Sequence, residues 1–151
     1  MTVRELSRIA VTVGPGSFTG VRVGLAFARG LAIPQQVPVV GVTTLEVLAA
    51  GVAGHEGSVR VVLIDARRGQ LYGQVFAHDR LAPLCEPFIL APSEAAVLVK
   101  KIAVGREPIF TGSGVPLAFP ERAADFDWGA QQPDPVVLAG RARERAPADQ
   151  P

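Results

Sequence analysis

The sequence has few of the side chains that metal and redox chemistry require. Cys85 is the single cysteine, and His55 and His78 are the two histidines, among 151 residues. One cysteine cannot form a disulfide within the chain, and two histidines in separate segments lack the spacing of metal ligands. The sequence therefore predicts no metal site and favours a reducing, cytoplasmic compartment.

An excess of charge of one sign and a long apolar run are also missing. The 15 Lys and Arg residues nearly balance the 14 Asp and Glu residues, which argues against strong capture of nucleic acid by this chain alone. The longest stretch without charge, residues 30–45, contains Pro34 and Pro38 and is not typical of a membrane span. With 48% hydrophobic residues, the chain is predicted to be a globular protein with a buried core and no membrane association.

Short β-branched runs alternate with helical patterns along the first part of the chain. Pro34 marks the end of the first helix, and Thr43 and Glu46 have the spacing of a capping box at the start of the second. In order, we expect a strand at residues 9–13, a helix at 21–33, a strand at 37–42 and a helix that ends in the glycine-rich residues 51–57.

A second unit is predicted to begin at Ser58 with two strands joined in a hairpin. The expected strands are residues 59–64, 71–77, 84–90 and 108–111, and the expected helices are residues 92–101 and 135–145. This order predicts an α/β protein with a mixed sheet. The expected organisation is a first lobe at residues 1–57, a second lobe at 58–145 and a frayed tail at 146–151.

The junction between the first strand and the first helix, residues 14–20 (GPGSFTG), is the segment with chemical character. Glycines permit backbone angles that other residues resist, and free amides at a helix start bind anions. The candidate nucleotide or anion loop comprises Gly14, Gly16, Ser17 and Thr19. The alternative is a tight strand-to-helix turn without a ligand, which local physics alone favours.

Two familiar phosphate loops do not match this segment. Pro15 and Val21 stand where a Walker loop requires glycine and lysine, and Thr19 stands where the dinucleotide fingerprint requires its third glycine. The segment therefore belongs to neither class of nucleotide-binding loop.

The helix after this loop is apolar on most of its sides. Small residues recur every four positions at Gly20, Gly24 and Ala28, which would let another backbone approach closely. Glycine within a helix costs about 1 kcal/mol relative to alanine, so a packing reason is expected. Either the helix is buried within its own chain, or one face packs against a helix of a partner; we favour the partner. The predicted interface residues are Gly20, Val23, Gly24, Phe27 and Gly30.

Three segments in order carry a resemblance to a known family. GPGSFTGVRVGLAFARGLAI, VPVVGVTTLEVLA and IDARRGQLYGQVF closely resemble successive motifs of the bacterial TsaB (YeaZ) family. The similarity covers residues 9–76 and continues more weakly over residues 112–138. It implies an actin-like ATPase (RNase H-like) fold. The N-terminal lobe is expected to be incomplete, because this sequence has no counterpart of the family's first strands. It also has no counterpart of the family's C-terminal segment.

The resemblance also implies a function. TsaB-like proteins are non-catalytic partners of a TsaD-like enzyme in forming N6-threonylcarbamoyladenosine next to the tRNA anticodon. The implied partners are this paralogue in a heterodimer, a TsaE-like ATPase, tRNA bound through the complex, and a second copy when the protein is alone. The helix at residues 20–33 would lie in the dimer interface. No cofactor is assigned to this chain itself, and ATP or ADP would belong to the complex.

The residues also allow other interpretations of the site and of the function. The serines have no base beside them in a known motif, so no catalytic residue is expected. Asp65 and Arg67, at the end of a strand in the second lobe, could bind metal-linked phosphate, although an ion pair that stabilises the turn is favoured. The alternative functions are an independent ATPase or kinase-like enzyme of the same superfamily and a truncated product without activity.

Overall fold

The computed structural model of the protein describes residues 5–125 and 132–145, which form two compact units. One unit comprises Met1–Val47 with Asp134–Pro151, and the other comprises Leu48–Pro133.

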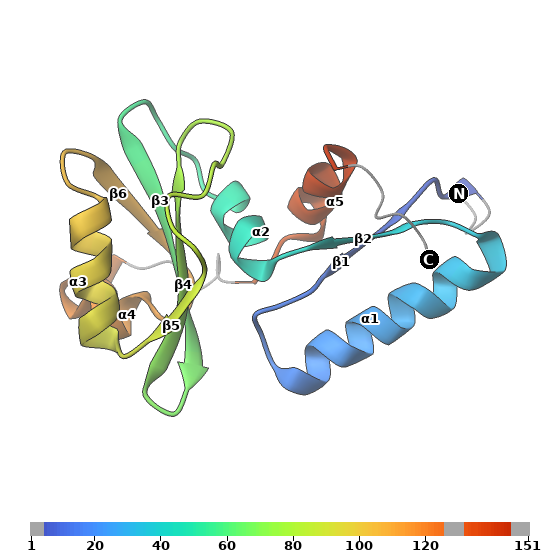
Figure 1. Ribbon diagram of the computed structural model, residues 1–151, viewed down its shortest axis with the longest axis horizontal. Coiled ribbons are helices and arrows are strands. Elements are labelled where there is room, and N and C mark those ends of the chain that lie inside the picture. Colours follow the sequence, from blue (N-terminus) through green and yellow to red (C-terminus); the bar gives the residue numbers. More distant parts are fainter. Residues whose placement is uncertain (1–4, 126–131, 146–151) are drawn as a thin grey trace. The chain divides into compact units, whose positions relative to one another are not determined.

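The first unit is built on a pair of parallel strands, β1 (Ile9–Thr12) and β2 (Val39–Val42). Helix α1 (Phe18–Ala32) and helix α5 (Pro135–Arg143) cover opposite faces of this pair (Figure 1). Its core contains buried apolar side chains from β2, α2 (Thr44–Gly51) and α5, namely Val40, Val42, Val47 and Ala142.

Local signals in the sequence set the helix ends in this unit. Ser17 caps α1, because its side chain accepts a hydrogen bond from the Gly20 amide at 3.0 Å. After α1 the chain forms a short 3-10 helix, η2 (Ile33–Gln35), that contains Pro34. Asp134 caps α5 by accepting from the Val136 amide, and Pro135 occupies the first turn, where its missing N–H costs nothing.

The second unit is a four-stranded mixed sheet in the order β5-β4-β3-β6. Strands β3 (Ser58–Arg67), β4 (Gln70–Ala77) and β5 (Phe88–Leu90) are antiparallel, and β6 (Glu107–Thr111) runs parallel to β3. Helices α3 (Pro92–Ile102) and α4 (Val115–Ala118) pack on one face of the sheet, followed by a 3-10 helix, η3 (Pro120–Asp125) (Figure 1). Alternate residues of β3 supply the centre of this core: Val59, Val61 and Leu63 are at most 1% exposed.

The predicted α/β class with a mixed sheet is confirmed, and most predicted elements lie within a few residues of their expected places. The strand expected at residues 84–90 is reduced to β5. Pro83 makes an isolated bridge to Phe76, and Gln74 donates its side-chain amide to the Cys85 carbonyl at 3.1 Å, so this stretch is held without a regular ladder. The four-residue helix α4 and η3 were not predicted, because segments this short carry no periodic pattern.

The division into units differs from the lobes expected from the sequence. The boundary falls after Val47 rather than at residue 57, and α5 belongs to the first unit rather than the second. The physical reason is that α5 packs on β1 and β2 through Leu138 and Ala142 and pairs with Glu46. The expected tail at residues 146–151 lies outside the described residues.

Candidate functional site

The glycine loop joins β1 to α1 and is tied to the start of α2. Gly14 has a φ of +96°, a conformation that favours glycine, and its carbonyl accepts a hydrogen bond from the Thr44 amide at 2.8 Å. The loop therefore lies at the carboxyl ends of both parallel strands, the edge at which α/β proteins place ligand sites.

The four residues of the predicted anion loop have different environments. Gly14 is buried and Gly16, Ser17 and Thr19 are exposed. The Ser17 hydroxyl is engaged as the helix cap, and in the part of the chain that the structure describes the amides of Phe18 and Thr19 have no acceptor. The geometry satisfies the interpretation as a strand-to-helix turn, and nucleotide binding here stays a prediction.

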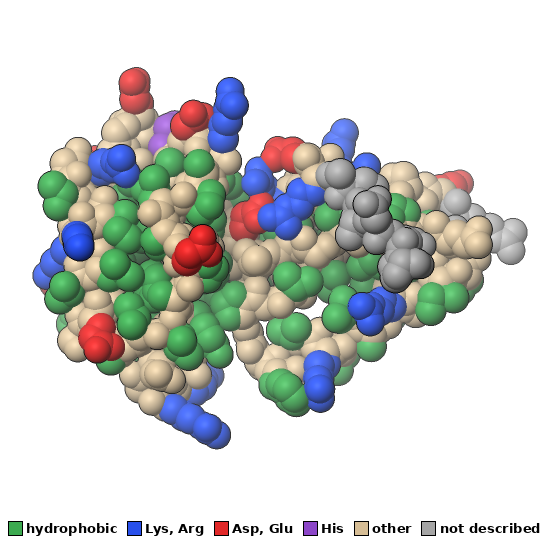
Figure 2. Space-filling view, viewed as in Figure 1, with side chains coloured by type: hydrophobic (Ala, Val, Ile, Leu, Met, Phe, Trp, Pro, Cys, Tyr) green, Lys and Arg blue, Asp and Glu red, His purple; other side chains and the backbone are tan. Residues whose placement is uncertain are grey.

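One side of α1 exposes large apolar side chains. Val23 is 63% exposed and Phe27 68%, although such side chains are normally buried in helices of this kind; Phe18, at the start of the helix and on another side, is 71% exposed. Arg22 lies over the Phe18 ring with its guanidinium carbon 4.1 Å from the ring centroid. Figure 2 shows apolar and arginine side chains, without acidic ones, along the visible part of α1. This surface, the α1 outer face, comprises Gly20, Val23, Phe27 and Gly30 with Ile33 just beyond the helix end.

The structure brings four of the five predicted interface residues onto this face and places the fifth elsewhere. Gly24 is half-buried against β1, where a Cβ would lie 3.8 Å from the Val11 side chain. Ala28 is buried at 3% exposure, so the row of small residues turns from the outer face into the unit itself. The groove expected along Gly20, Gly24 and Ala28 is therefore not a continuous outer surface.

Gly20 and Gly30 of α1 differ in their surroundings. A Cβ at Gly20 would lie 2.6 Å from the Ser17 hydroxyl oxygen, so this glycine makes room for the helix cap. A Cβ at Gly30 would meet nothing within 4 Å in the described residues. The contacts of the chain itself thus account for Gly20 and leave Gly30 unexplained.

Asp65 and Arg67 form a turn at the end of β3. An Asp65 carboxylate oxygen accepts from the Arg67 amide at 2.7 Å, and the Arg67 guanidinium lies 3.8 Å from the other oxygen. The Asp65 amide donates to the Ser113 hydroxyl at 3.1 Å, which joins this turn to the loop after β6. These contacts agree with the turn-stabilising interpretation of the pair.

The histidines and the cysteine lie apart from one another. His55 pairs with Glu107 at 3.3 Å on the surface, and the backbone carbonyl of His78 accepts from Arg60 at 3.3 Å. Burial raises the pKa of the Cys85 thiol, which holds it in the protonated, unreactive form. Within residues 5–125 and 132–145, no three His, Cys, Asp or Glu side chains are grouped so that they could hold a metal ion.

Sequence reasoning did not identify Glu46 as a centre of interactions. It assigned Glu46 to a capping box, and half of that box is present, since the Glu46 amide donates to the Thr43 hydroxyl at 3.1 Å. The Glu46 carboxylate instead accepts from Arg141 and Arg145 of the C-terminal segment. No local spacing in the sequence signals a pairing of this range.

Known proteins resemble this chain both in sequence and in fold. A family model described as TsaD, tRNA N6-adenosine threonylcarbamoyltransferase, matches residues 1–108. The TsaB protein of Escherichia coli K12 is 40% identical over 79 residues, which cover 52% of this chain and 34% of that protein. The TsaB protein of Bacillus subtilis 168 is 41% identical over 78 residues, again 52% and 34%. The chain thus matches about a third of the length of these curated relatives.

Solved structures give the same result for the fold. YeaZ from Pseudomonas aeruginosa aligns with a TM-score of 0.56 and 29% identity, covering 61% of this chain and 45% of that one. An uncharacterized protein with similarity to peptidase YeaZ aligns with a TM-score of 0.65 over 95% of this chain and 69% of that one; at 23% identity it supports the fold alone.

Together, the mixed α/β units and these alignments define a protein of the actin-like, RNase H-like class. The two curated relatives described above are both named TsaB. The chain belongs to the family that the TsaD model describes, and within it is similar to the TsaB (YeaZ) proteins. None of the helices within the described residues is long and apolar enough to cross a membrane.

Proposed function

We propose that this protein acts in the formation of N6-threonylcarbamoyladenosine in tRNA as the non-catalytic partner of a TsaD-type enzyme. Its TsaB relatives are named as tRNA threonylcarbamoyladenosine biosynthesis proteins, which supports the pathway. The observation that carries the partner role is the α1 outer face, where Val23 and Phe27 remain exposed.

The proposed occupant of the α1 outer face is a helix of the TsaD-type paralogue. Burying apolar surface stabilises by about 25 cal/mol per Å², so two large exposed side chains on one helix favour association. Gly30, where a Cβ would meet nothing within 4 Å in the described residues, would let a second helix approach closely beside Phe27. A paralogue of the same fold presents an equivalent helix, and the two would pack face to face.

Co-purification with the TsaD-type paralogue of the same organism tests this role. Val23→Asp places a charge at the centre of the α1 outer face and should reduce binding at least tenfold. Val97→Asp is the matched control, because Val97 is equally exposed, at 69%, on helix α3 of the other unit. Equal binding by wild type and Val23→Asp would contradict the interface, and absence of a complex with the wild-type protein would contradict the partner role.

The proposed role also includes further partners and a homodimer of the isolated protein. A TsaE-like ATPase and tRNA would join the pair, with ATP or ADP bound in the complex, and the isolated protein would use the α1 outer face to form a homodimer. Sedimentation of wild type and Val23→Asp tests the homodimer, since only the variant should sediment as a monomer. Titration with ADP, alone and with the partners present, tests whether the loop at Gly14–Thr19 takes part.

A further inference from the structure

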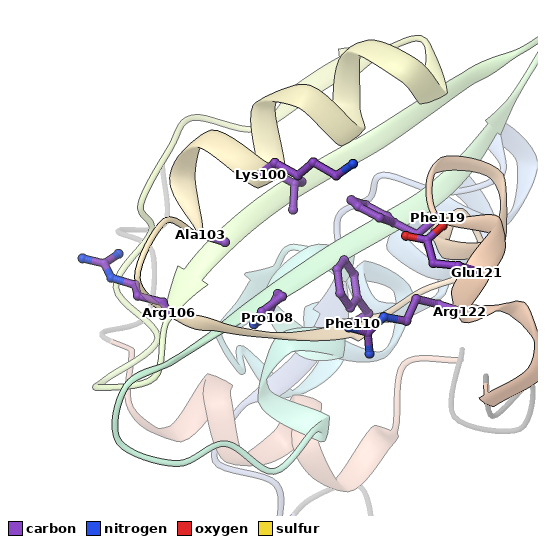
Figure 3. Close-up of a pocket in the computed structure, with 9 residues that line it drawn as sticks. Lys100, Ala103, Arg106, Pro108, Phe110, Phe119, Glu121 and Arg122 are labelled. Carbon is purple, nitrogen blue, oxygen red and sulfur yellow. The ribbon is translucent and has the colours of Figure 1, made fainter.

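A cavity of about 280 Å³ lies in the second unit, beside the edge strand β6. It is bounded by the C-terminal half of α3, by β6 and by the start of η3 (Figure 3). Its size is at the lower end for ligand sites, which suits a single base-sized group rather than a large cofactor. None of the residues in the glycine loop or on the α1 outer face lines it.

The floor of this cavity is apolar and aromatic. The Phe110 and Phe119 rings lie with centroids 4.7 Å apart and planes tilted by 52°. Phe110 is half-buried and offers the more accessible ring, whereas Phe119 is buried at 4% exposure; Val99 and Ala103 of the α3 region add buried aliphatic surface, at 1% and 9% exposure. A floor of this kind favours a flat group with an apolar face.

The rim of the cavity is positively charged. Lys100, Arg106 and Arg122 line it and are exposed, and the one acidic residue beside them is Glu121. In Figure 3 the Lys100 and Arg122 side chains extend beside the two phenylalanine rings, whereas Arg106 points outward. The Arg122 guanidinium carbon lies 5.4 Å from the centroid of the Phe110 ring.

Like several other exposed arginines of the protein, these cations have no acidic partner among the described residues. Among the carboxylates whose side chains the structure describes, none lies within ion-pair distance of Lys100, Arg106 or Arg122. By contrast, Arg141 and Arg145 share Glu46. Three unpaired cations around an apolar floor form a site for a ligand with a flat ring and a negative charge.

We propose that this cavity receives one nucleotide of a single-stranded RNA. The base would lie against the phenylalanine floor, and the adjoining phosphates would contact Lys100, Arg106 and Arg122. RNA-binding proteins recognise unpaired bases by combining aromatic or guanidinium planes with cations that follow the backbone. An acidic peptide would satisfy the cations but would leave the apolar floor without a matching group. Only the identification of the RNA as tRNA rests on the proposed function.

Fluorescence anisotropy of the full chain tests this site, with a labelled ten-nucleotide single-stranded RNA as probe. The double variant Lys100→Ala/Arg122→Ala should weaken binding at least tenfold at low salt. It should also reduce the slope of log affinity against log salt by about 1.4, since each lost phosphate contact on a single strand contributes about 0.7. The matched control Lys101→Ala/Arg68→Ala removes the same charge from exposed positions outside the cavity. It should change the affinity by less than about twofold.

A second variant separates the cavity from the charge around it. Ala103→Leu fills the floor and leaves every charge in place, so it should weaken RNA binding as well. No binding by wild type, equal losses in the control variant, or full affinity in Ala103→Leu would each overturn the site. Circular dichroism of each variant checks that the fold is retained.

Two competitors distinguish the sources of the ligand. Displacement of the probe by AMP would support the cavity as a nucleotide site that also accepts the free monomer, and displacement by unlabelled RNA alone would support a site for the polymer. Displacement by polyglutamate as effective as by RNA would overturn the proposal in favour of an acidic protein. The double variant should still co-purify with the TsaD-type paralogue, so this test and that of the α1 outer face can fail separately.

Discussion

Glu46 and Arg141, 95 residues apart in the sequence, form an ion pair in which the arginine Nε and one terminal nitrogen donate to the same carboxylate oxygen at 2.9 and 2.8 Å. Arg145 donates to the other Glu46 oxygen and to the Gly41 carbonyl at 2.7 Å. Both carboxylate oxygens of a side chain that is only 10% exposed are therefore satisfied. This cluster attaches α5 to the strands and helix at the opposite end of the chain, which explains why α5 belongs to the first unit.

The Glu46 cluster predicts a large loss of stability when its carboxylate is removed. Glu46→Gln leaves two arginines beside a neutral amide, and breaking a mostly buried pair in this way should lower the free energy of unfolding by about 3 kcal/mol. Urea unfolding of the purified protein measures this. Glu144→Gln is the control, because Glu144 pairs with the same Arg141 but is 65% exposed, and its loss should cost at most about 1 kcal/mol. Equal midpoints for the two variants would contradict a central role for Glu46.

At Gly112 we expect a loss of stability with a purely steric cause. It has a φ of +99°, and a Cβ there would lie 2.2 Å from the Leu63 carbonyl oxygen, which is backbone and cannot move aside. Gly112→Ala should therefore destabilise the second unit by about 3 kcal/mol or more, at the upper end of point-mutation effects. Gly105 is the control: it has a φ of +72° with nothing within 4 Å of its Cβ position, so Gly105→Ala should cost only about 1 kcal/mol. Comparable thermal unfolding of both variants would show that the close approach at Leu63 is not tight.

The contrast between local and distant signals explains what the sequence predicts and what it misses. The helix α1 is predictable because Ser17 and Pro34 lie at its ends, and the β3–β4 hairpin because its strands are adjacent in sequence. The place of α5 is not, since it depends on contacts with Glu46, far away along the chain.

The candidate sites also differ in whether local sequence signals or distant contacts determine them. The exposed positions of α1 follow from helical periodicity once its buried side is known, whereas Gly24 is half-buried because a four-residue repeat drifts around the helix, and its predicted interface role stays a prediction. The cavity was not found from the sequence, because Phe110 and Phe119 come from different elements and neither belongs to a motif.

The Cys85 thiol predicts a measurable pH dependence. Burial raises its pKa; a hydrogen bond with the Val75 backbone acts in the opposite direction, and the Glu86 carboxylate adds to the rise. At a given pH the folded protein then holds less thiolate than the unfolded chain, so alkylation by iodoacetamide should reach its half-maximal rate at a higher pH in the folded protein. Because the folded state keeps the proton more tightly, its stability should be unchanged below the pKa of the unfolded thiol and should fall as pH rises from there through the higher pKa of the folded thiol. The same half-maximal pH with and without denaturant would refute the effect.

We expect different responses to the same substitution at Gly20 and at Gly30 of α1. Gly30→Ala adds a methyl group in open space, so the isolated protein should gain up to about 1 kcal/mol of helix stability. Gly20→Ala would gain the same propensity but displace the Ser17 hydroxyl, 2.6 Å away, and losing this cap costs about 1 kcal/mol, so its stability should not rise. If Gly30 is glycine because a partner helix approaches there, Gly30→Ala should also weaken binding to the TsaD-type paralogue while it stabilises the free protein. Unfolding and co-purification measured on the same two variants decide this: a Gly30→Ala variant that is more stable and binds the paralogue as tightly as wild type would remove that glycine from the interface.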